Sequence, residues 1–312
     1  MPFIEVTAVS KSFAGSAGTR HVLRDVSLGV EHGEFVSIVG AMGSGKSTLL
    51  SLLAGLTSPD AGRIVIGGEP VRGIRKDGAF VFQNYSLLPW FTALENVRLA
   101  VEAAFPDLSR QAQRARAVET LERVGLGSAL NRRPRQLSGG MRQRVSIARA
   151  FATRPEVLFL DEPFGALDAL TRETLQQELA RLCTDGERPV TTVMITNNVE
   201  EAILLSDRII PMIPGPLDFA RGALTLRQAQ GHPEHRRGVS PTERAPATLG
   251  KPIPVELSRP RTVAQLAHDE QATHARGHVI AALTAALGRK RVSTSSGAVP
   301  SAVLQPATEE TR

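Results

Sequence analysis

The stretch Gly40-Ala41-Met42-Gly43-Ser44-Gly45-Lys46-Ser47 decides the fold of this chain. Its glycines, lysine and serine have the spacing of a phosphate-binding loop, or P-loop. The apolar run Glu34 to Val39 before it predicts a short strand, and Ser47 to Leu56 after it predicts a helix that stops at Ser58-Pro59. A P-loop requires this order of strand, loop and helix, so the flanking segments argue against a chance match.

Each part of this loop has a chemical role toward a bound triphosphate. Glycines let backbone N–H groups converge on phosphate oxygens, and the amino end of the following helix favours negative charge. We expect Lys46 to reach the outer phosphates and Ser47 to ligate Mg²⁺. The predicted nucleotide-binding residues of the loop are Gly40, Ala41, Met42, Gly43, Ser44, Gly45, Lys46, Ser47 and Thr48.

Two further apolar runs predict strands of the same sheet. Val157 to Leu160 and Val190 to Ile195 each border a helical segment, and such repeated units predict a parallel sheet buried on both faces. Asp161 and Glu162 follow the first run, at the carboxyl edge where ligands of open α/β sheets bind. We expect Asp161 to orient Mg²⁺ through water and Glu162 to polarise the attacking water. Strands that end in acids are common, so this interpretation depends on the P-loop.

The rest of the chain predicts an antiparallel edge and a helical insert. Ile4 to Phe13 and Val22 to Val30 read as strands separated by a glycine-containing turn. Residues 85–150 predict a mainly helical subdomain, with helices over Phe91 to Ala104 and Ser109 to Val124. The fold class is therefore α/β.

Composition limits the function classes. The 312 residues are 42% apolar and 22% charged, enough for a substantial core, and no run of about 18 apolar residues predicts a membrane span. The net charge is +6, and residues 217–312 hold 13 Lys plus Arg against 8 Asp plus Glu. These charges are scattered among Pro, Ala, Ser and Gly, which favours a solvated tail over a nucleic-acid or membrane-binding site. The single cysteine, Cys183, is consistent with a reducing cytoplasm.

A second glycine-rich stretch, Leu137-Ser138-Gly139-Gly140-Met141-Arg142-Gln143-Arg144, resembles the signature motif of ABC ATPases. From its residues alone it is either another anion cradle at a helix amino end or a plain turn before a helix. The resemblance implies the P-loop NTPase fold of ABC ATPases, with an antiparallel β edge, a mostly parallel core sheet and an inserted helical subdomain. It also implies a head-to-tail dimer in which Ser138, Gly139 and Gly140 of one subunit close over the ATP on the P-loop of the other.

Other positions carry the same resemblance. Phe13 resembles the aromatic residue that stacks on adenine, although an aromatic on an edge strand is more often simple packing. Gln83, after the predicted strand Ala79 to Phe82, resembles the glutamine that contacts Mg²⁺ and the attacking water. Gly165 to Asp168 resembles the loop that crosses the dimer interface. The predicted domains are an ABC ATPase domain over 1–216, a basic loop or disordered insert over 217–250, an extension over 251–288 and a disordered tail over 289–312.

One position departs from the family pattern. Asn197 stands where ABC ATPases usually place a histidine that contacts the γ-phosphate. An asparagine amide donates a hydrogen bond but carries no positive charge and takes up no proton. Our hypothesis is that ATP binding and dimer closure survive while turnover is slower. The alternative is a weakly hydrolysing ATP switch in a heterodimer, against which the intact Lys46, Asp161 and Glu162 argue.

The segment Phe82 to Trp90 resembles importers for nitrate, nitrite, cyanate, taurine and aliphatic sulfonates. Short matches further along, including Arg259-Pro260-Arg261 with His268-Asp269, are similar to nitrate-type members; His268-Asp269 itself reads as a surface cap or turn. We therefore expect nitrate-type import, with sulfonate or taurine import as the alternative. Tyr85 to Phe91 clusters apolar side chains that either receive a partner's helix or cap the helical subdomain's core.

The resemblance also implies the partners and the location. These are a second ATP-binding subunit, transmembrane permease subunits and, indirectly, a solute-binding protein, at the cytoplasmic face of the inner membrane. No nucleic-acid partner is expected, because ABC ATPases that act on nucleic acid or ribosomes usually carry two cassettes or a long coiled-coil insert, and this sequence has neither.

Overall fold

The core sheet is built around β3 (Phe35–Val39), the fully buried strand that leads into the P-loop. The computed structural model describes residues 1–15, 18–184, 189–215 and 246–288. The other strands of this sheet are β6 (Gly78–Val81), β7 (Val157–Asp161), β8 (Thr191–Thr196), β9 (Arg208–Ile213), β10 (Thr248–Leu249) and β11 (Ile253–Pro254). Their order is β10-β9-β3-β8-β7-β6, with β11 also paired to β9. Strands β9 to β6 in this order pair in parallel, whereas β10 and β11 run antiparallel to β9.

Successive side chains of the core strands enter two different apolar layers. On β7, Val157 and Phe159 belong to one buried cluster, whereas Leu158 and Leu160 belong to the other. All four side chains are buried, so this strand reads as a continuous apolar run without polar alternation. The predicted parallel sheet, covered on both faces, is confirmed.

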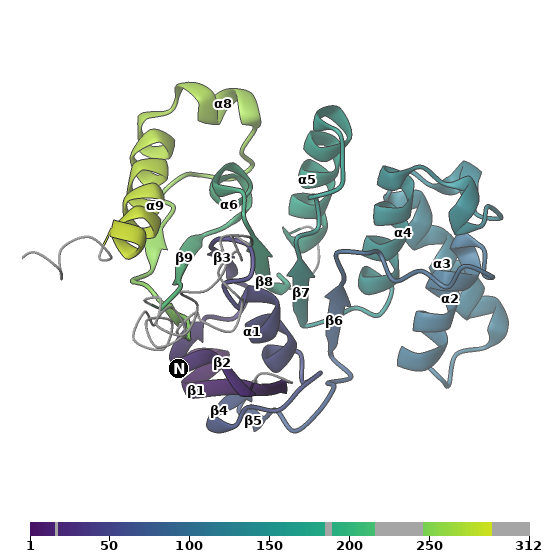
Figure 1. The fold of residues 1–312 in the computed structure, drawn as a ribbon. Coiled ribbons are helices and arrows are strands. Elements are labelled where there is room, and N and C mark those ends of the chain that lie inside the picture. Colours follow the sequence, from purple (N-terminus) through teal and green to yellow (C-terminus); the bar gives the residue numbers. More distant parts are fainter. Residues whose placement is uncertain (16–17, 185–188, 216–245, 289–312) are drawn as a thin grey trace, which may run out of the picture.

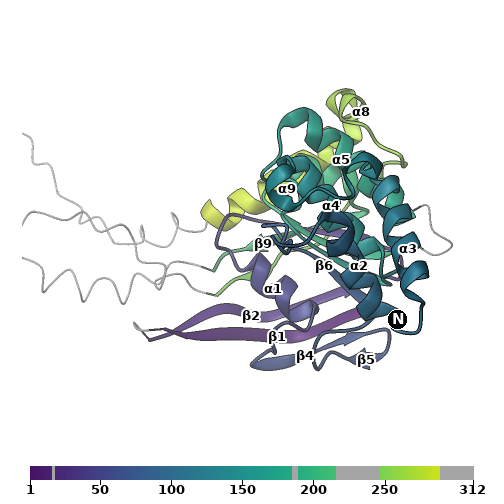
Figure 2. The same ribbon diagram turned by 90° about the vertical axis from the view of Figure 1, so that its right-hand side faces the viewer.

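The second sheet is antiparallel and lies beneath the first. It contains β1 (Ile4–Gly15), β2 (Gly18–Val30), β4 (Ala61–Ile66) and β5 (Glu69–Pro70) in the order β2-β1-β4-β5. Figure 2 shows β1 and β2 as a long ribbon below α1 (Lys46–Leu53). Leu49, Leu50, Leu52 and Leu53 of α1 are buried in the cluster that also holds residues of both sheets. The helix therefore fills the space between the two sheets.

Three helices lie together at one side of the core sheet (Figure 1): α2 (Ala93–Ala104), α3 (Arg110–Arg123) and α4 (Gly139–Phe151). Two short 3-10 turns, η1 (Gly127–Ala129) and η2 (Pro134–Gln136), connect α3 to α4. The predicted helix starts at Phe91 and Ser109 were early, because Thr92 and Ser109 are N-caps with extended backbone. We propose that these three helices form the subdomain predicted over 85–150.

Four helices cover the face of the core sheet opposite α1. They are α5 (Ala169–Thr184), α6 (Val199–Leu205), α8 (Val263–His268) and α9 (Glu270–Gly288). Helices α8 and α9 belong to the predicted extension, and Leu266 and Ala272 are buried in the same cluster as α6. The Asp269 carboxylate accepts a hydrogen bond from Ala272 N at 3.0 Å, as expected for a cap. Within the described ranges, no helix is long and apolar enough to cross a bilayer.

The insert predicted over 217–250 falls largely outside the described residues, and the tail predicted over 289–312 falls wholly outside them. Residues 246–250 depart from the predicted loop. The backbone of Ala247 exchanges hydrogen bonds with β2 at Val22 (2.8 Å) and Arg24 (3.0 Å), and Thr248 and Leu249 form β10. The predicted domain boundary near residue 216 stays a prediction.

Candidate active site

The P-loop turns from β3 into α1 through two glycines with positive φ. Gly43 has φ 72° and Gly45, the N-cap of α1, has φ 100°, a region that glycine adopts without strain. A Cβ on Gly45 would also lie 3.1 Å from side-chain atoms of Val22 and Leu23. No side chain of the described residues caps α1. Its first N–H groups are therefore available to an anion.

Lys46 is buried at the base of this loop. Its side chain is 4% exposed, and Nζ donates hydrogen bonds to the carbonyls of Gly40 at 2.8 Å and Ala41 at 3.1 Å. Glu162 Oε1 lies 3.8 Å from Nζ. Burial lowers the pKa of Lys46, while the charges of Glu162 and Asp161 act in the opposite direction. The ammonium group is thus held inside the loop by weak neutral partners and one distant carboxylate, which a phosphate oxygen can replace.

Polar side chains of α1, of the end of β7 and of the residues that follow β6 and β7 form hydrogen bonds beside Lys46. Ser47 Oγ donates to Asp161 Oδ1 at 3.3 Å, and Gln83 Nε2 donates to Glu162 Oε2 at 3.4 Å. Burial raises the pKa of Asp161, so a cation beside this carboxylate would favour its charged form. Glu162 has φ 43°, a conformation that is sparsely populated for a non-glycine residue and that recurs at functional sites.

These oxygen donors fit a magnesium ion that also binds phosphate. Mg²⁺ prefers one or two protein carboxylate or hydroxyl ligands together with substrate phosphates and water. Ser47 and Asp161 supply such a pair within hydrogen-bonding distance of each other. Across the described ranges, no group of three or more His, Cys, Asp and Glu is arranged to hold a metal by itself. The donor set is therefore suited to a metal that arrives with a nucleotide.

The P-loop and the β1–β2 hairpin share one cavity of about 420 Å³. Of the predicted site residues, the cavity is lined by Phe13, Met42, Gly43, Gly45, Lys46, Ser47, Thr48, Gln83 and Glu162. Gly40 and Ala41 contribute the carbonyls that hold Lys46. Ser44 is buried, and its hydroxyl has no hydrogen-bond partner among the described residues. That unpaired donor is a further sign that the loop is shaped for a polar ligand.

The three signature residues lie elsewhere in the single chain. Ser138 is the N-cap of α4, and its Oγ accepts a hydrogen bond from Met141 N at 3.2 Å. A Cβ on Gly140 would lie 2.3 Å from Thr171 Cγ2 in α5, so the close approach of α4 and α5 requires glycine there. Neither Ser138, Gly139 nor Gly140 lines the P-loop cavity. One chain alone does not bring the two anion cradles together.

Asn197 lies at the same edge of the core sheet as the P-loop, although it does not line the cavity. Thr196 pairs with Val39, the residue that directly precedes Gly40. Asn197 is exposed and makes no side-chain hydrogen bond among the described residues. Its neighbour Asn198 caps α6 by accepting hydrogen bonds from Glu200 N at 2.9 Å and Glu201 N at 3.4 Å.

Two cavity residues were missed from the sequence: Arg20 and Val22. Arg20 is the cross-strand partner of Phe13, and Gly15 pairs with Gly18 at the turn. Counting back equally from that turn places Arg20 opposite Phe13, so the hairpin pattern contained the signal. A guanidinium beside an aromatic ring gives this end of the cavity a cation in addition to an apolar surface.

The parallel sheet and the loop at the amino end of α1 define an α/β nucleotide-binding protein of the P-loop class. A family model described as ABC transporter matches residues 23–165. The dimeric structure of the ATP-binding cassette MJ0796 bound to ADP and Pi, in a post-hydrolysis state, has a TM-score of 0.61 and 36% sequence identity; the match covers 67% of this chain and 93% of that one.

Curated relatives agree with this class. The nitrate import ATP-binding protein NrtD of Synechococcus elongatus is 49% identical over 69% of this chain and 77% of its own length. The nitrate transport protein NasD of Klebsiella oxytoca is 41% identical over 89% of this chain and 95% of its own length. The bicarbonate transport ATP-binding protein CmpC of Synechococcus elongatus is 49% identical over 72% of this chain, which spans only 34% of that longer protein. The chain belongs to the ABC transporter family.

Proposed function

We propose that this chain is the ATP-binding and ATP-hydrolysing subunit of an ABC importer for a small anion of the nitrate type. The observation that carries the proposal is the convergence of Lys46, Ser47, Gln83 and Glu162 on one cavity beside the exposed amino end of α1. In this arrangement Lys46 and the loop amides bind the outer phosphates. Phe13 offers a 45% exposed ring for stacking on adenine.

Hydrolysis is assigned to the carboxylates at the end of β7. Glu162 polarises the water that attacks the γ-phosphate, and Gln83, 3.4 Å from Glu162, orients that water. Ser47, Asp161 and Gln83 would hold Mg²⁺ in this proposal. When bound, Mg²⁺ supplies positive charge beside the outer phosphate oxygens. Asn197 donates an amide hydrogen bond toward the γ-phosphate but supplies no charge.

A second ATP-binding subunit completes the site in this proposal. Ser138, Gly139 and Gly140 form the start of α4 and lie away from the cavity of their own chain, so they are placed to meet the nucleotide of a partner. The similarity to a dimeric ATP-binding cassette supports this arrangement. The partner is a second copy or a related subunit.

The transported solute is assigned from the relatives. NasD, whose name describes nitrate transport, is matched over 95% of its own length and 89% of this chain, and this match favours nitrate. Sulfonate or taurine import is the alternative. The chain would act with transmembrane permease subunits and, indirectly, a solute-binding protein, at the cytoplasmic face of the inner membrane. We assign no nucleic-acid partner.

The segment Tyr85 to Phe91 is the proposed contact for a permease helix. Trp90 is 63% exposed, whereas Leu87 packs against the apolar cluster that includes the helical subdomain. The segment thus has one side chain free for a partner and one that serves the core. An exposed indole beside a fixed backbone is suited to docking an apolar helix.

A second candidate function is an ATP-driven switch that closes as a heterodimer and hydrolyses slowly. Asn197 is the observation that favours it, because the amide cannot take up a proton or carry charge. Glu162→Gln separates the two candidates. In an active ATPase this substitution traps a stable ATP-bound dimer that the wild-type chain does not accumulate, whereas in a slow switch both chains accumulate it.

The proposal is tested by Lys46→Ala. Loss of a buried charged contact to phosphate should weaken Mg-ATP binding by about tenfold to 100-fold and abolish turnover. Arg63→Ala, which removes an exposed ion pair with Glu5 far from the loop, serves as the control. Unchanged nucleotide affinity and turnover in Lys46→Ala would refute the nucleotide site. With the native membrane partners present, the anion that stimulates ATP hydrolysis identifies the solute.

A further inference from the structure

Side chains of the C-terminal extension bind both ends of α6, the helix that directly follows Asn197 and its neighbour Asn198. At the amino end of α6, Arg276 of α9 forms a two-point ion pair with Glu200. Arg276 Nε lies 2.5 Å from Glu200 Oε1, and Nη2 lies 2.8 Å from Oε2. Glu200 is in the first turn of α6, three residues after Asn197. The guanidinium therefore holds the end of α6 that is nearest to Asn197.

At the other end of α6, two arginines of the same extension bind its final carbonyls. Arg261 is 8% exposed, and Nη1 donates to the carbonyls of Ile203 and Ser206, each at 2.7 Å. Arg259 donates to the carbonyl of Leu205 and pairs with Asp207 at 3.0 Å. Cations at a helix carboxyl end also complement the helix dipole. Both ends of α6 are thus fixed by side chains of one segment.

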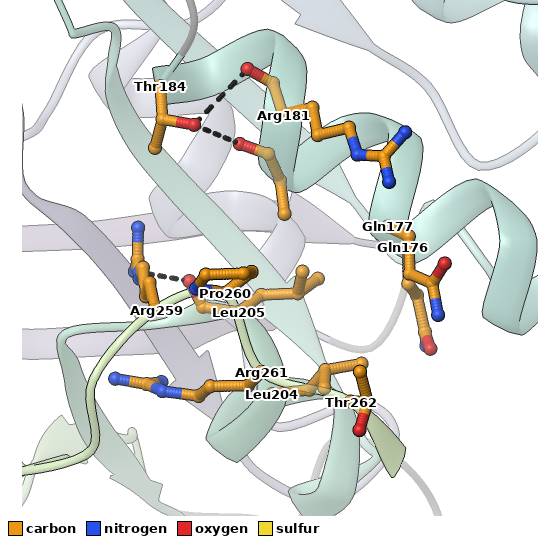
Figure 3. Close-up of a pocket in the computed structure, with 11 residues that line it drawn as sticks. Gln176, Gln177, Arg181, Thr184, Leu204, Leu205, Arg259, Pro260, Arg261 and Thr262 are labelled. Atoms are coloured by element: carbon orange, nitrogen blue, oxygen red, sulfur yellow. Dashed lines mark hydrogen bonds between the residues drawn. The ribbon is translucent and has the colours of Figure 1, made fainter. Parts of the chain in front are cut away.

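A cavity lies between this end of α6 and α5. Figure 3 shows Leu204 and Leu205 beside the segment Arg259 to Thr262 of the extension. Gln176, Gln177 and Arg181 of α5 lie on the opposite side. The space between them is about 520 Å³. The hydrogen bonds of Arg259 and Arg261 are contacts that this end of α6 makes without α5.

The position of α6 sets the position of Asn197 through a short rigid turn. Thr196 Oγ donates to Glu201 Oε2 at 2.8 Å, and Asn198 N donates back to Thr196 Oγ at 3.0 Å. Asn198 Oδ1 in turn accepts from the N–H groups of Glu200 and Glu201. The turn and the first residues of α6 are therefore one hydrogen-bonded unit. A shift of α6 would carry Asn197 with it.

We propose that the C-terminal extension places Asn197 for ATP hydrolysis, with Arg276 as a positioning residue that acts through Glu200 and α6. This inference rests on the proposed function, because it assumes that Asn197 faces the γ-phosphate. Arg276 itself touches neither the P-loop cavity nor its lining residues. Its removal should therefore lower kcat and leave KM for ATP nearly unchanged. The pair is partly exposed, which limits the expected loss to about threefold to fivefold.

The test is a charge reversal across the pair in the full chain. Arg276→Glu and Glu200→Arg should each lower kcat by about threefold to fivefold, and the double variant should recover at least about half of the wild-type value. Arg98→Glu is the matched control. The pair Arg98 and Glu102 on α2 has side-chain exposures of 35% and 52%, close to the 28% and 55% of Arg276 and Glu200. That control should leave kcat unchanged.

A second comparison separates positioning from general destabilisation. In an Asn197→Ala background, Arg276→Glu should lower kcat no further, because the group that it places is gone. A loss of the same size in that background, a change confined to KM, or no recovery in the double variant would overturn the inference. Wild-type hydrolysis and its loss in Lys46→Ala are measured alongside. If the wild-type chain hydrolyses no ATP, the proposed function fails; if it does and the reversal has no effect, only this inference fails.

Discussion

Replacing Asn197 by histidine should raise the rate of ATP hydrolysis. Asn197 follows the strand residue Thr196, whose partner Val39 leads into the P-loop, so its side chain starts from the edge where the triphosphate is expected. The amide can donate one hydrogen bond to a phosphate oxygen but adds no charge. A protonated imidazole would add a cation to the same hydrogen bond. The developing charge of the transition state should therefore be better stabilised.

The size of the gain follows from the surroundings of Asn197. A hydrogen bond to a charged partner contributes about 1.5–3 kcal/mol, and a neutral one about 1 kcal/mol, so full replacement is worth at most about 30-fold in rate. Asn197 is exposed, and solvent screens an added charge there. We therefore expect about threefold. An ordinary histidine has a pKa of about 6.5, so the ratio of variant to wild-type rate should fall as the pH rises through that value.

The assay is steady-state ATP hydrolysis by the purified subunit assembled with its membrane partners, between about pH 6 and about pH 8. Asn197→Gln keeps the amide and controls for the change in size, and thermal unfolding controls for altered stability. A variant that gains nothing at any pH would refute the reasoning. A gain that is the same at every pH would show that the proton on the imidazole is not the source of the effect.

Further predictions concern the side chains of Arg20 and Cys183. Arg20→Ala should weaken Mg-ATP binding by about threefold to tenfold while Arg20→Lys retains most of the affinity, because Arg20 lines the nucleotide cavity beside Phe13; equal losses in a titration calorimeter would contradict a role for its charge. Cys183 is 4% exposed, and burial raises its pKa to about 12. The folded protein should therefore resist thiol reagents and react only in urea. Rapid labelling of the native protein would be inconsistent with this burial. The unfolded thiol releases its proton from about pH 9 upward whereas the folded one keeps it, so this cysteine's contribution to stability should decline from pH 9 toward pH 12.

The P-loop and the acids of β7 could be predicted from the sequence because their signals are local. The loop needs glycine at Gly43 and Gly45 for backbone reasons, and both positions have positive φ in the structure. Asp161 ends β7 and Glu162 follows it, and the apolar residues of this strand are all buried. In each case a few consecutive residues contain both the conformation and the chemistry.

The contacts of the C-terminal extension could not be predicted in the same way. Strands β10 and β11 have two residues each, too few for any periodicity, and both pair with the distant strand β9. The pairing of Arg276 with Glu200 joins residues 76 positions apart. Arg20 is an easier case, because its partner Phe13 is close in sequence and the register of the hairpin brings the two residues together.

The pairing of Ile213 with Thr248 brings the two ends of a long connection to neighbouring positions on one sheet. Because the sheet itself joins these ends, the segment 214–247 does not need a particular length to close. In general, doubling the length of a loop raises its closure free energy by only about 0.6 kcal/mol. This site is therefore suited to genetic insertion of a tag or a fluorescent domain.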